Sequence, residues 1–145
     1  MSFTKVIYHI VIRTKHSELT INQQYANDLY AYMQGIVKKH NCRLYQINGI
    51  EDHIHILLDL HPSIALANFV QSLKRSSSLW LQNQYEKFPH FRCWSEGYAA
   101  FTYSYSDRHT LINYIKNQQE HHAYESTKDE LMRILETNGY QKEEK

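Results

Sequence analysis

The chain has few of the residues that bend or interrupt secondary structure, with 2 prolines and 4 glycines among 145 residues. Flexible linkers rich in glycine or proline are therefore not expected. A hydrophobic fraction of 42% and a charged fraction of 21% lie in the range of folded proteins and exclude general disorder. At this length we expect a single domain over residues 1–145 with one substantial core, in which residues from about 125 to 145 form a C-terminal helix and tail.

Cysteine is also scarce, and long apolar runs are missing. Cys42 and Cys93 lack the paired spacing of a metal site, which predicts free thiols in a reducing compartment. No apolar stretch approaches the roughly 20 residues that a membrane span needs. The segment 6–12 is interrupted by Tyr8 and His9, unlike the core of a signal peptide. We therefore expect a soluble cytoplasmic protein with no membrane partner.

The chain has no excess of basic residues, since its formal net charge is +1. Strong nucleic-acid binders usually carry a basic excess, so any such site here must be a local patch. The sequence is unusual in its 12 tyrosines, whose rings can stack on bases or simply fill strands.

The most informative stretch is residues 51–60, EDHIHILLDL. Successive side chains of a β-strand point to opposite faces, so one face carries apolar residues and the other carries His53 and His55 side by side. Imidazole is a common metal ligand, and a strand with a buried back holds such a pair rigidly. The plain alternative is a half-exposed strand that happens to carry two histidines.

A second informative stretch lies in a predicted helix that begins at Ser106 or Asp107 and runs to about Tyr124. Tyr114 and Gln118 are four residues apart and share one face of that helix. A lone tyrosine on a helix is usually a packing residue. A tyrosine one turn from a carboxamide, in a chain that also has a His-x-His strand, suggests a site.

The remaining pattern alternates strands and helices. Strands are predicted at 5–14, 43–49 and 101–106, with a short glycine-containing turn between the second of these and the histidine strand. Helices are predicted from Thr20 to His40 with Thr20 as N-cap and from Ser63 to about Gln84. A last helix is predicted after 126, where the pattern Thr127-x-x-Glu130 is typical of a capping box.

Several residues are candidates for DNA contact: Arg13, Lys74, Arg75, Trp94, Tyr98 and Phe101. Lys74 and Arg75 form a basic pair that is followed by three serines. This segment could bind a phosphate backbone, or it could be an ordinary solvated helix face. The aromatic residues could stack on unpaired bases, or could belong to the core or to a dimer contact.

These motifs and their order resemble the HUH-type single-tyrosine transposases of the smallest bacterial insertion sequences. The resemblance extends over nearly the whole chain, from YHIVIRTK through DHIHILLDL and Gly97-Tyr98 to YIKNQQEHH. It implies that His53, His55 and Gln118 bind a divalent metal, Mg²⁺ or Mn²⁺, and that Tyr114 is the nucleophile.

The resemblance also implies an α+β fold, a ferredoxin-like (RRM-like) sandwich whose antiparallel sheet has helices on one face. It implies a DNA transposase that cleaves and rejoins single-stranded DNA with hairpin ends through a 5′-phosphotyrosine. It further implies a homodimer in which active sites are shared between subunits. The roles of Asp52, His121 and His122 stay open: ligand, orienting group, interface residue or turn cap.

Three alternatives remain at the level of sequence. One is a relative that acts on chromosomal repeat hairpins instead of on the ends of its own element. Another is a module that only binds single-stranded nucleic acid and has no use for Tyr114 beside Gln118. The third is a small structural metal protein that would tolerate Tyr114→Phe.

Overall fold

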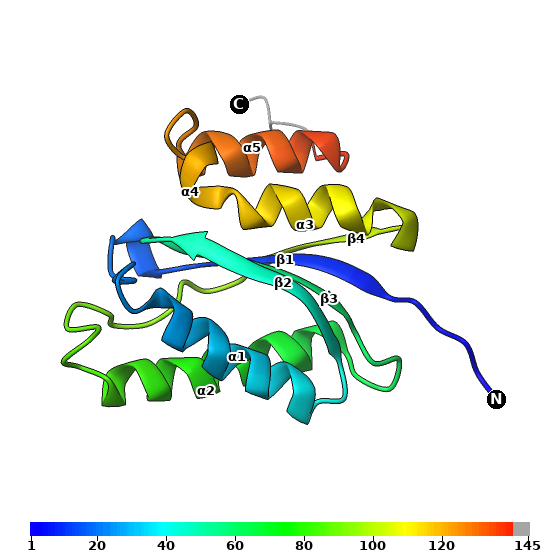
Figure 1. The fold of residues 1–145 in the computed structure, drawn as a ribbon, viewed down its shortest axis with the longest axis horizontal. Coiled ribbons are helices and arrows are strands. Elements are labelled where there is room, and N and C mark those ends of the chain that lie inside the picture. The colour runs from blue at the N-terminus through cyan, green and yellow to red at the C-terminus, as the bar shows by residue number, and fades with distance from the viewer. Residues whose placement is uncertain (141–145) are drawn as a thin grey trace.

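The computed structural model describes residues 1–140 and contains a four-stranded antiparallel sheet (Figure 1). The strands are β1 (Ile7–Arg13), β2 (Arg43–Ile50), β3 (His53–Asp59) and β4 (Ala99–Tyr103), in the spatial order β2-β3-β1-β4. The two central strands, β3 and β1, are thus flanked on both sides by partners. The expected α+β class, antiparallel sheet and alternating element order are confirmed.

The helices form two layers, one on each side of the sheet (Figure 1). Helices α1 (Ala26–Lys39) and α2 (Leu66–Asn83) cover one face, and α3 (Arg108–Lys116), α4 (Gln118–His121) and α5 (Thr127–Thr137) lie over the other. Short 3₁₀ turns occupy Lys15–Ser17 and Tyr105–Asp107. The expectation of helices on one face is therefore wrong for the C-terminal third of the chain.

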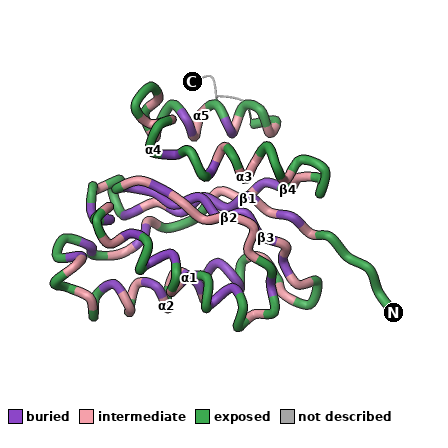
Figure 2. Tube along the Cα trace, in the orientation of Figure 1, coloured by how far each residue is buried: buried purple, intermediate pink, exposed green. Residues whose placement is uncertain are grey.

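The alternation of β3 explains why both faces need a cover. Ile54, Ile56 and Leu58 are fully buried against α1 and α2 in the main core. Leu57 points the other way and forms a smaller cluster with Ile7 of β1 and Ile115 of α3. Figure 2 shows that burial is concentrated in the strands between the two helical layers. Burial of each such apolar side chain stabilises the fold by about 1.5–3 kcal/mol relative to leaving it exposed. The hydrophobic effect therefore favours packing of the second helical layer on the sheet, as it favours packing of the first.

Helices α1 and α2 begin later than the sequence predicts, because the segments that contain the proposed caps are held by other hydrogen bonds. The backbone N–H groups of Thr20 and Ile21 donate to the carbonyl of Glu51, so this segment is tied to the β2–β3 turn and α1 starts only at Ala26. The Ser63 hydroxyl lies 2.6 Å from Nδ1 of His61, and α2 starts at Leu66.

The turn between β2 and β3 requires glycine at position 49. A Cβ there would lie 2.1 Å from the backbone oxygen of His53, closer than any real contact. This close approach brings the start of β3 against the end of β2 and fixes where His53 lies.

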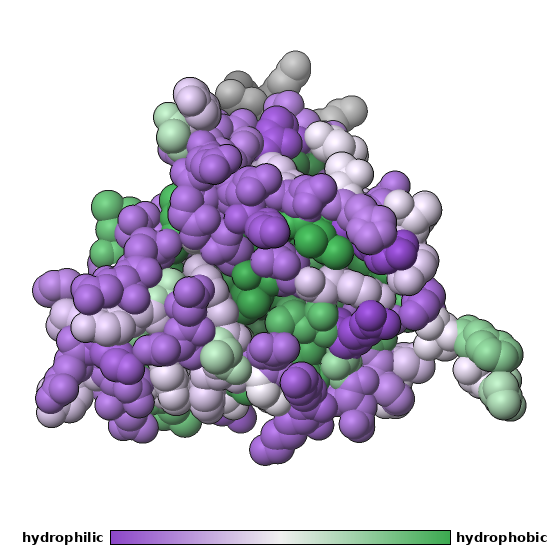
Figure 3. Space-filling view, viewed as in Figure 1, coloured by the Kyte–Doolittle hydropathy of each residue, from purple (hydrophilic) through white to green (hydrophobic). Residues whose placement is uncertain are grey.

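Figure 3 shows apolar side chains across the middle of one face, between the hydrophilic residues of the two helical layers. Among residues 1–140, no helix is both long and apolar enough to cross a bilayer. The predicted C-terminal helix is α5, and the final residues 141–145 of the predicted tail lie outside the described part of the chain.

Candidate active site

Strand β3 presents two histidines to the layer formed by α3, α4 and α5. His53 and His55 are both fully buried, and Nε2 of one ring lies 3.1 Å from Nε2 of the other. The pair is thus not on a half-exposed strand, as the plain alternative supposed. Because polar groups are buried only when they have partners, what surrounds these nitrogens decides what the pair can do.

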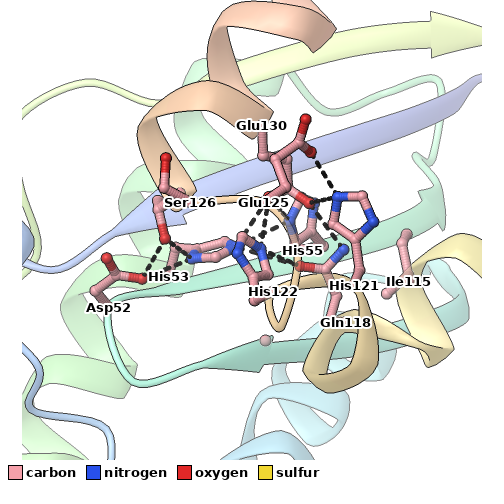
Figure 4. Close-up of polar contacts among 12 residues, drawn as sticks. Asp52, His53, His55, Ile115, Gln118, His121, His122, Glu125, Ser126 and Glu130 are labelled. Atoms are coloured by element: carbon pink, nitrogen blue, oxygen red, sulfur yellow. Dashed lines mark hydrogen bonds and ion pairs between the residues drawn. The ribbon is translucent and has the colours of Figure 1, made fainter.

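A carboxylate from α5 is the central partner of both rings. Oε1 of Glu130 lies 3.1 Å from Nε2 of His53 and 2.9 Å from Nε2 of His55 (Figure 4). Glu130 is itself only 2% exposed. It comes from a part of the chain more than seventy residues after the strand, so only the tertiary fold brings it here.

Glu130 was not predicted as a site residue, because its spacing from Thr127 suggested a helix cap. In the structure the cap is Ser126, whose hydroxyl accepts a hydrogen bond from the backbone N–H of Asp129. The Thr127 hydroxyl instead donates to Asp52 at 2.9 Å. The predicted capping box of Thr127 and Glu130 is therefore wrong. The sequence signal that remains for Glu130 is its position as an acidic residue in the first turn of a helix that has a different cap.

Gln118 reaches the cluster because the predicted long helix is interrupted. Helix α3 ends at Lys116 and α4 starts at Gln118, whose Oε1 lies 3.3 Å from Nε2 of His53. Its Nε2 donates to Oε2 of Glu130 at 3.1 Å. The predicted association of Gln118 with the histidine pair is thus present in the geometry.

The two histidines after Gln118 contact different oxygens of Glu130. Nε2 of His122 lies 3.0 Å from Oε1 of Gln118 and 3.1 Å from Oε1 of Glu130, so His122 joins the cluster. His121 bonds Glu125, with 2.6 Å between Nε2 and Oε1 (Figure 4), and its Nε2 also lies 3.5 Å from Oε2 of Glu130. Both histidines thus contact Glu130, and His121, Glu125 and Glu130 form a second group that could hold a cation.

The donor set suits a divalent cation. One ligand atom from each of His53, His55, His122 and Glu130 can be chosen so that all lie within 4.8 Å of one another. The closest spacings in this set, 2.9 to 3.1 Å, are what adjacent ligands have around a cation with bonds of about 2.1 Å. Three imidazoles and one carboxylate fit Mn²⁺ or Zn²⁺ better than Mg²⁺, which prefers oxygen ligands.

Burial and hydrogen bonds set the charges of this cluster. Burial lowers the pKa of His55 to about 4 and that of His9 to about 3, so both rings are neutral at pH 7. For His53, burial acts in the same direction, but hydrogen bonds to Asp52 and Glu130 outweigh it and raise its pKa to about 9. Burial alone would raise the pKa of Glu130, yet the hydrogen bonds from His53 and His55 hold it far below its ordinary value.

Outer partners fix the orientation of each ring. Nδ1 of His53 lies 2.7 Å from Oδ1 of Asp52, and Nδ1 of His55 lies 2.7 Å from Nε2 of His9. Their Nε2 atoms are thereby left free to face Glu130. Such outer contacts are typical of histidines that ligate a metal. Asp52 is therefore an orienting group, and His9 is a second one that the sequence did not reveal.

Tyr114 lies at the edge of the same cluster. Its hydroxyl donates to Oε2 of Glu130 and accepts a hydrogen bond from Nη2 of Arg133 at 3.0 Å. The rings of Tyr114 and His55 are 5.9 Å apart, edge to face, within one chain. Partial burial and the adjacent carboxylate raise the pKa of the phenol, which is therefore protonated at neutral pH in this arrangement.

Comparison with known proteins assigns the chain to a family. The family model of IS200-like transposases matches residues 2–118, which is most of the chain. This chain belongs to the IS200-like transposase family. The match includes His53, His55, Tyr114 and Gln118, whereas His122 and Glu130 lie beyond its end.

Curated relatives and solved structures agree with this assignment. The IS200 transposase of Salmonella typhimurium is 27% identical over 78% of this chain and 76% of its own length. The ISDra2 transposase TnpA of Deinococcus radiodurans is 25% identical over 78% of this chain and 84% of its own. A crystal structure of a transposase candidate from Deinococcus radiodurans R1 has a TM-score of 0.64 at 26% identity, over 81% of this chain and 93% of that one.

A further similarity concerns the fold alone. The structure of a REP-associated tyrosine transposase bound to a REP hairpin has a TM-score of 0.62 at 8% identity, over 99% of this chain and 90% of that one. This likeness extends through α5, beyond the end of the family match.

The candidate DNA contacts of this IS200-like transposase fall into two groups. Trp94 and Phe101 are each only 7% exposed, and Nε1 of Trp94 donates to the Ser77 hydroxyl. These two residues are core, so the prediction that they stack on bases is wrong. Lys74 is held by the backbone carbonyls of Ser95 and Gly97, which leaves its ammonium a structural role.

The other candidates remain accessible. Arg13 at the end of β1 is partly exposed, Arg75 is exposed, and Tyr98 is 42% exposed. Arg13 is the register partner of His53, so it lies on the strand next to the histidine pair. These three residues stay predictions for DNA contact.

Proposed function

We propose that this chain is a metal-dependent transposase that cleaves and rejoins single-stranded DNA at insertion-sequence ends, with Tyr114 as the nucleophile. One observation carries the proposal: a single buried carboxylate, Glu130, contacts both the phenol of Tyr114 and the histidine pair of β3. Nucleophile and metal donors thus meet at one point, in a chain that belongs to a transposase family.

The reaction proposed is a transesterification. The phenol oxygen of Tyr114 attacks the scissile phosphorus, an O–P bond forms, and the bond from phosphorus to the 3′ oxygen breaks. The products are a 5′-phosphotyrosine and a strand with a free 3′-hydroxyl. Because the phosphodiester energy is kept in the adduct, a second 3′-hydroxyl can reverse the step and join a new strand without ATP.

Two side chains of the protein help Tyr114 to ionise: one accepts its proton and the other stabilises the charge on its oxygen. Glu130 already accepts the hydrogen bond of the phenol and is placed to take its proton as the O–P bond forms, and the leaving 3′ oxygen takes a proton from water to end as a hydroxyl. The Arg133 guanidinium lies beside the phenol oxygen and favours its ionised form. This help is needed, because an unperturbed tyrosine has a pKa of about 10 and burial here raises it further.

The proposed cofactor is a divalent metal held by His53, His55, His122 and Glu130, with Gln118 beside them. When bound, such a cation polarises the scissile phosphate and stabilises the charge that develops on it. Of the two ions expected from the sequence, Mg²⁺ and Mn²⁺, the imidazole-rich donor set favours Mn²⁺.

The proposed substrate is a single strand, since a scissile phosphate there can be bent into the site without melting a duplex. The fold neighbour bound to a REP hairpin supports a hairpin near the cleaved bond. A homodimer and a cytoplasmic location remain predictions. For the site itself we propose assembly within one chain, in contrast to the shared sites implied by the resemblance, because Tyr114 contacts Glu130 of its own chain.

The test is a covalent-adduct assay. Purified protein is mixed with Mn²⁺ or Mg²⁺ and single strands that contain the flanks of its gene, and the products are separated on a denaturing gel. We expect a slower protein–DNA band that is lost with EDTA, with Tyr114→Phe and with His53→Ala. Tyr140→Phe, at an exposed tyrosine, is the matched control and keeps the band.

The outcomes separate the alternatives. A band that persists in Tyr114→Phe shows that the nucleophile is another residue. Metal-independent strand binding without an adduct from any flank identifies a binding module instead of an enzyme. An adduct formed only with chromosomal repeat hairpins identifies a relative that serves the host genome.

A further inference from the structure

A cavity of about 300 Å³ lies on the face of the sheet that carries the cluster of His53, His55 and Glu130. Its floor includes Val11 and Arg13 of β1, the register partners of His55 and His53. Neighbouring strands are about 4.8 Å apart, so the cavity begins one strand away from the histidines. Helix α5 forms a shared wall, because Leu131 and Leu135 line the cavity while Glu130 faces the cluster.

The opposite wall, residues 95–99, is held in place by its backbone. The N–H of Ser95 donates to the carbonyl of Arg13 at 2.8 Å, and Nζ of Lys74 donates to the carbonyls of Ser95 and Gly97. Gly97 has a φ of +74°, a conformation that favours glycine. The wall is thus formed by the protein alone and does not need a ligand to shape it.

The lining combines apolar surface with two opposite charges. Val11, Ala99 and the two leucines are apolar, and Tyr98 adds an aromatic ring that is 42% exposed. Arg13 and Glu96 supply a planar donor and an acceptor at the same cavity. Within residues 1–140, neither side chain forms a salt bridge, and the Lys74 ammonium acts on Glu96 through space.

We propose that this cavity receives an unpaired guanine base of the DNA strand next to the scissile phosphate, a proposal that rests on the function proposed above. Guanine is the base whose edge offers acceptors, O6 and N7, together with donors, N1–H and the N2 amino group. Arg13 matches the acceptors and Glu96 matches the donors, while Tyr98 and the leucines contact the ring faces. The volume of this cavity is near the lower end of the range for ligand-binding pockets, so the cavity has room for one base but not for an oligonucleotide.

The test measures binding and needs no chemistry. Tyr114→Phe protein with Mn²⁺ is titrated into fluorescent thymidine strands that carry one central guanine, inosine or adenine, and fluorescence anisotropy gives each Kd. We expect guanine to bind about tenfold tighter than adenine, with inosine between them because it lacks the N2 amino group.

Variants assign the contacts. Added to Tyr114→Phe, Glu96→Gln removes most of the difference between guanine and inosine. Arg13→Lys keeps the positive charge but loses the two-donor fork, and it reduces the preference of guanine over adenine. Leu135→Trp fills the cavity and removes all base preference. Glu86→Gln, the same chemical change at an exposed site, leaves every ratio unchanged.

Two results overturn the proposal: equal affinity for the three strands, or a guanine preference that survives Glu96→Gln, Arg13→Lys and Leu135→Trp. The adduct assay with wild-type protein is read separately. A base preference without adduct keeps the pocket and refutes the proposed enzyme, whereas an adduct without base preference does the reverse.

Discussion

Among single residues, Glu130 has the most connections to the site. Its two carboxylate oxygens contact His53, His55 and His122 on one side and Tyr114 and Gln118 on the other. The carboxylate of Glu130 supplies the negative charge that a cation site needs. Without it, the buried site would contain only three imidazole rings and one amide.

Replacement of this carboxylate therefore tests the metal site directly. We expect Glu130→Gln, which keeps size and shape, to weaken Mn²⁺ binding by at least tenfold, as measured by isothermal titration calorimetry. Glu120→Gln, at an exposed position of α4, is the matched control and binds Mn²⁺ like the wild type. Unchanged affinity in Glu130→Gln would show that the carboxylate is not a ligand.

The buried histidines also predict how stability depends on pH in metal-free protein. The pKa values of His9 and His55 are lowered to about 3 and about 4, so below pH 6.5 the unfolded chain takes up protons that the folded chain does not, and stability falls. The pKa of His53 is raised to about 9, so its contribution is complete below pH 6.5 and is lost as the pH rises through 9.

We therefore expect the free energy of unfolding in EDTA to be highest near pH 6.5 and to decline on both sides, as measured by urea unfolding from pH 4 to 9. His9→Asn should flatten the acid side, because one of the two buried neutral rings is removed. A stability that rises steadily from pH 6.5 to 9 would contradict the assigned charge of His53.

At the scale of elements, the break between α3 and α4 decides where the tyrosine and the glutamine lie. Asn48 of β2 sits at this break: its Nδ2 donates to the carbonyls of Ile115 and Lys116, each at 3.0 Å. Gln119 returns hydrogen bonds to Oδ1 of Asn48 and to the carbonyl of Gly49, each at 2.9 Å. The end of α3 is thereby attached to the edge strand of the sheet.

Asn48→Asp should loosen this attachment. The change is isosteric but replaces the donor with an oxygen that faces two carbonyls. We expect the free energy of unfolding to fall by about 1–3 kcal/mol. We expect the yield of covalent adduct to fall by a larger fraction than the free energy of unfolding does. Asn83→Asp, at the exposed end of α2, provides the comparison. Full adduct yield in Asn48→Asp would mean that the nucleophile does not depend on this contact.

The same elements show what sequence patterns could predict. The alternation in 51–60 placed both histidines on one face, and the four-residue spacing placed Tyr114 and Gln118 together, because strand and helix periods are local properties. Glu130 and Trp94 were misread, since capping and stacking patterns do not reveal which face a distant helix or strand will bury. Likewise, the break at Asn117 depends on Asn48, a partner sixty-seven residues from Ile115 in sequence.

At the scale of the whole molecule, the second helical layer supports the proposed assembly of the site within one chain. Residues 104–107 connect β4 to α3 and span at most about 14 Å, so α3 begins close to its own sheet. There it is fixed by Asn48, by the cluster of Ile7, Leu57 and Ile115, and by the contact of Tyr114 with Glu130. Exchange of the tyrosine helix between two copies would have to break all three attachments.

A mixing experiment tests this arrangement. Tyr114→Phe and His53→Ala proteins are each expected to form no adduct, and we expect an equimolar mixture to form none either, because neither chain holds both groups. The mixture is co-refolded from urea so that any dimer can form with one subunit of each kind, and the denaturing gel is read against wild-type protein treated the same way. Adduct recovered in the mixture would show that the tyrosine of one subunit serves the histidines of another, and the single-chain site would have to be abandoned in favour of a shared one.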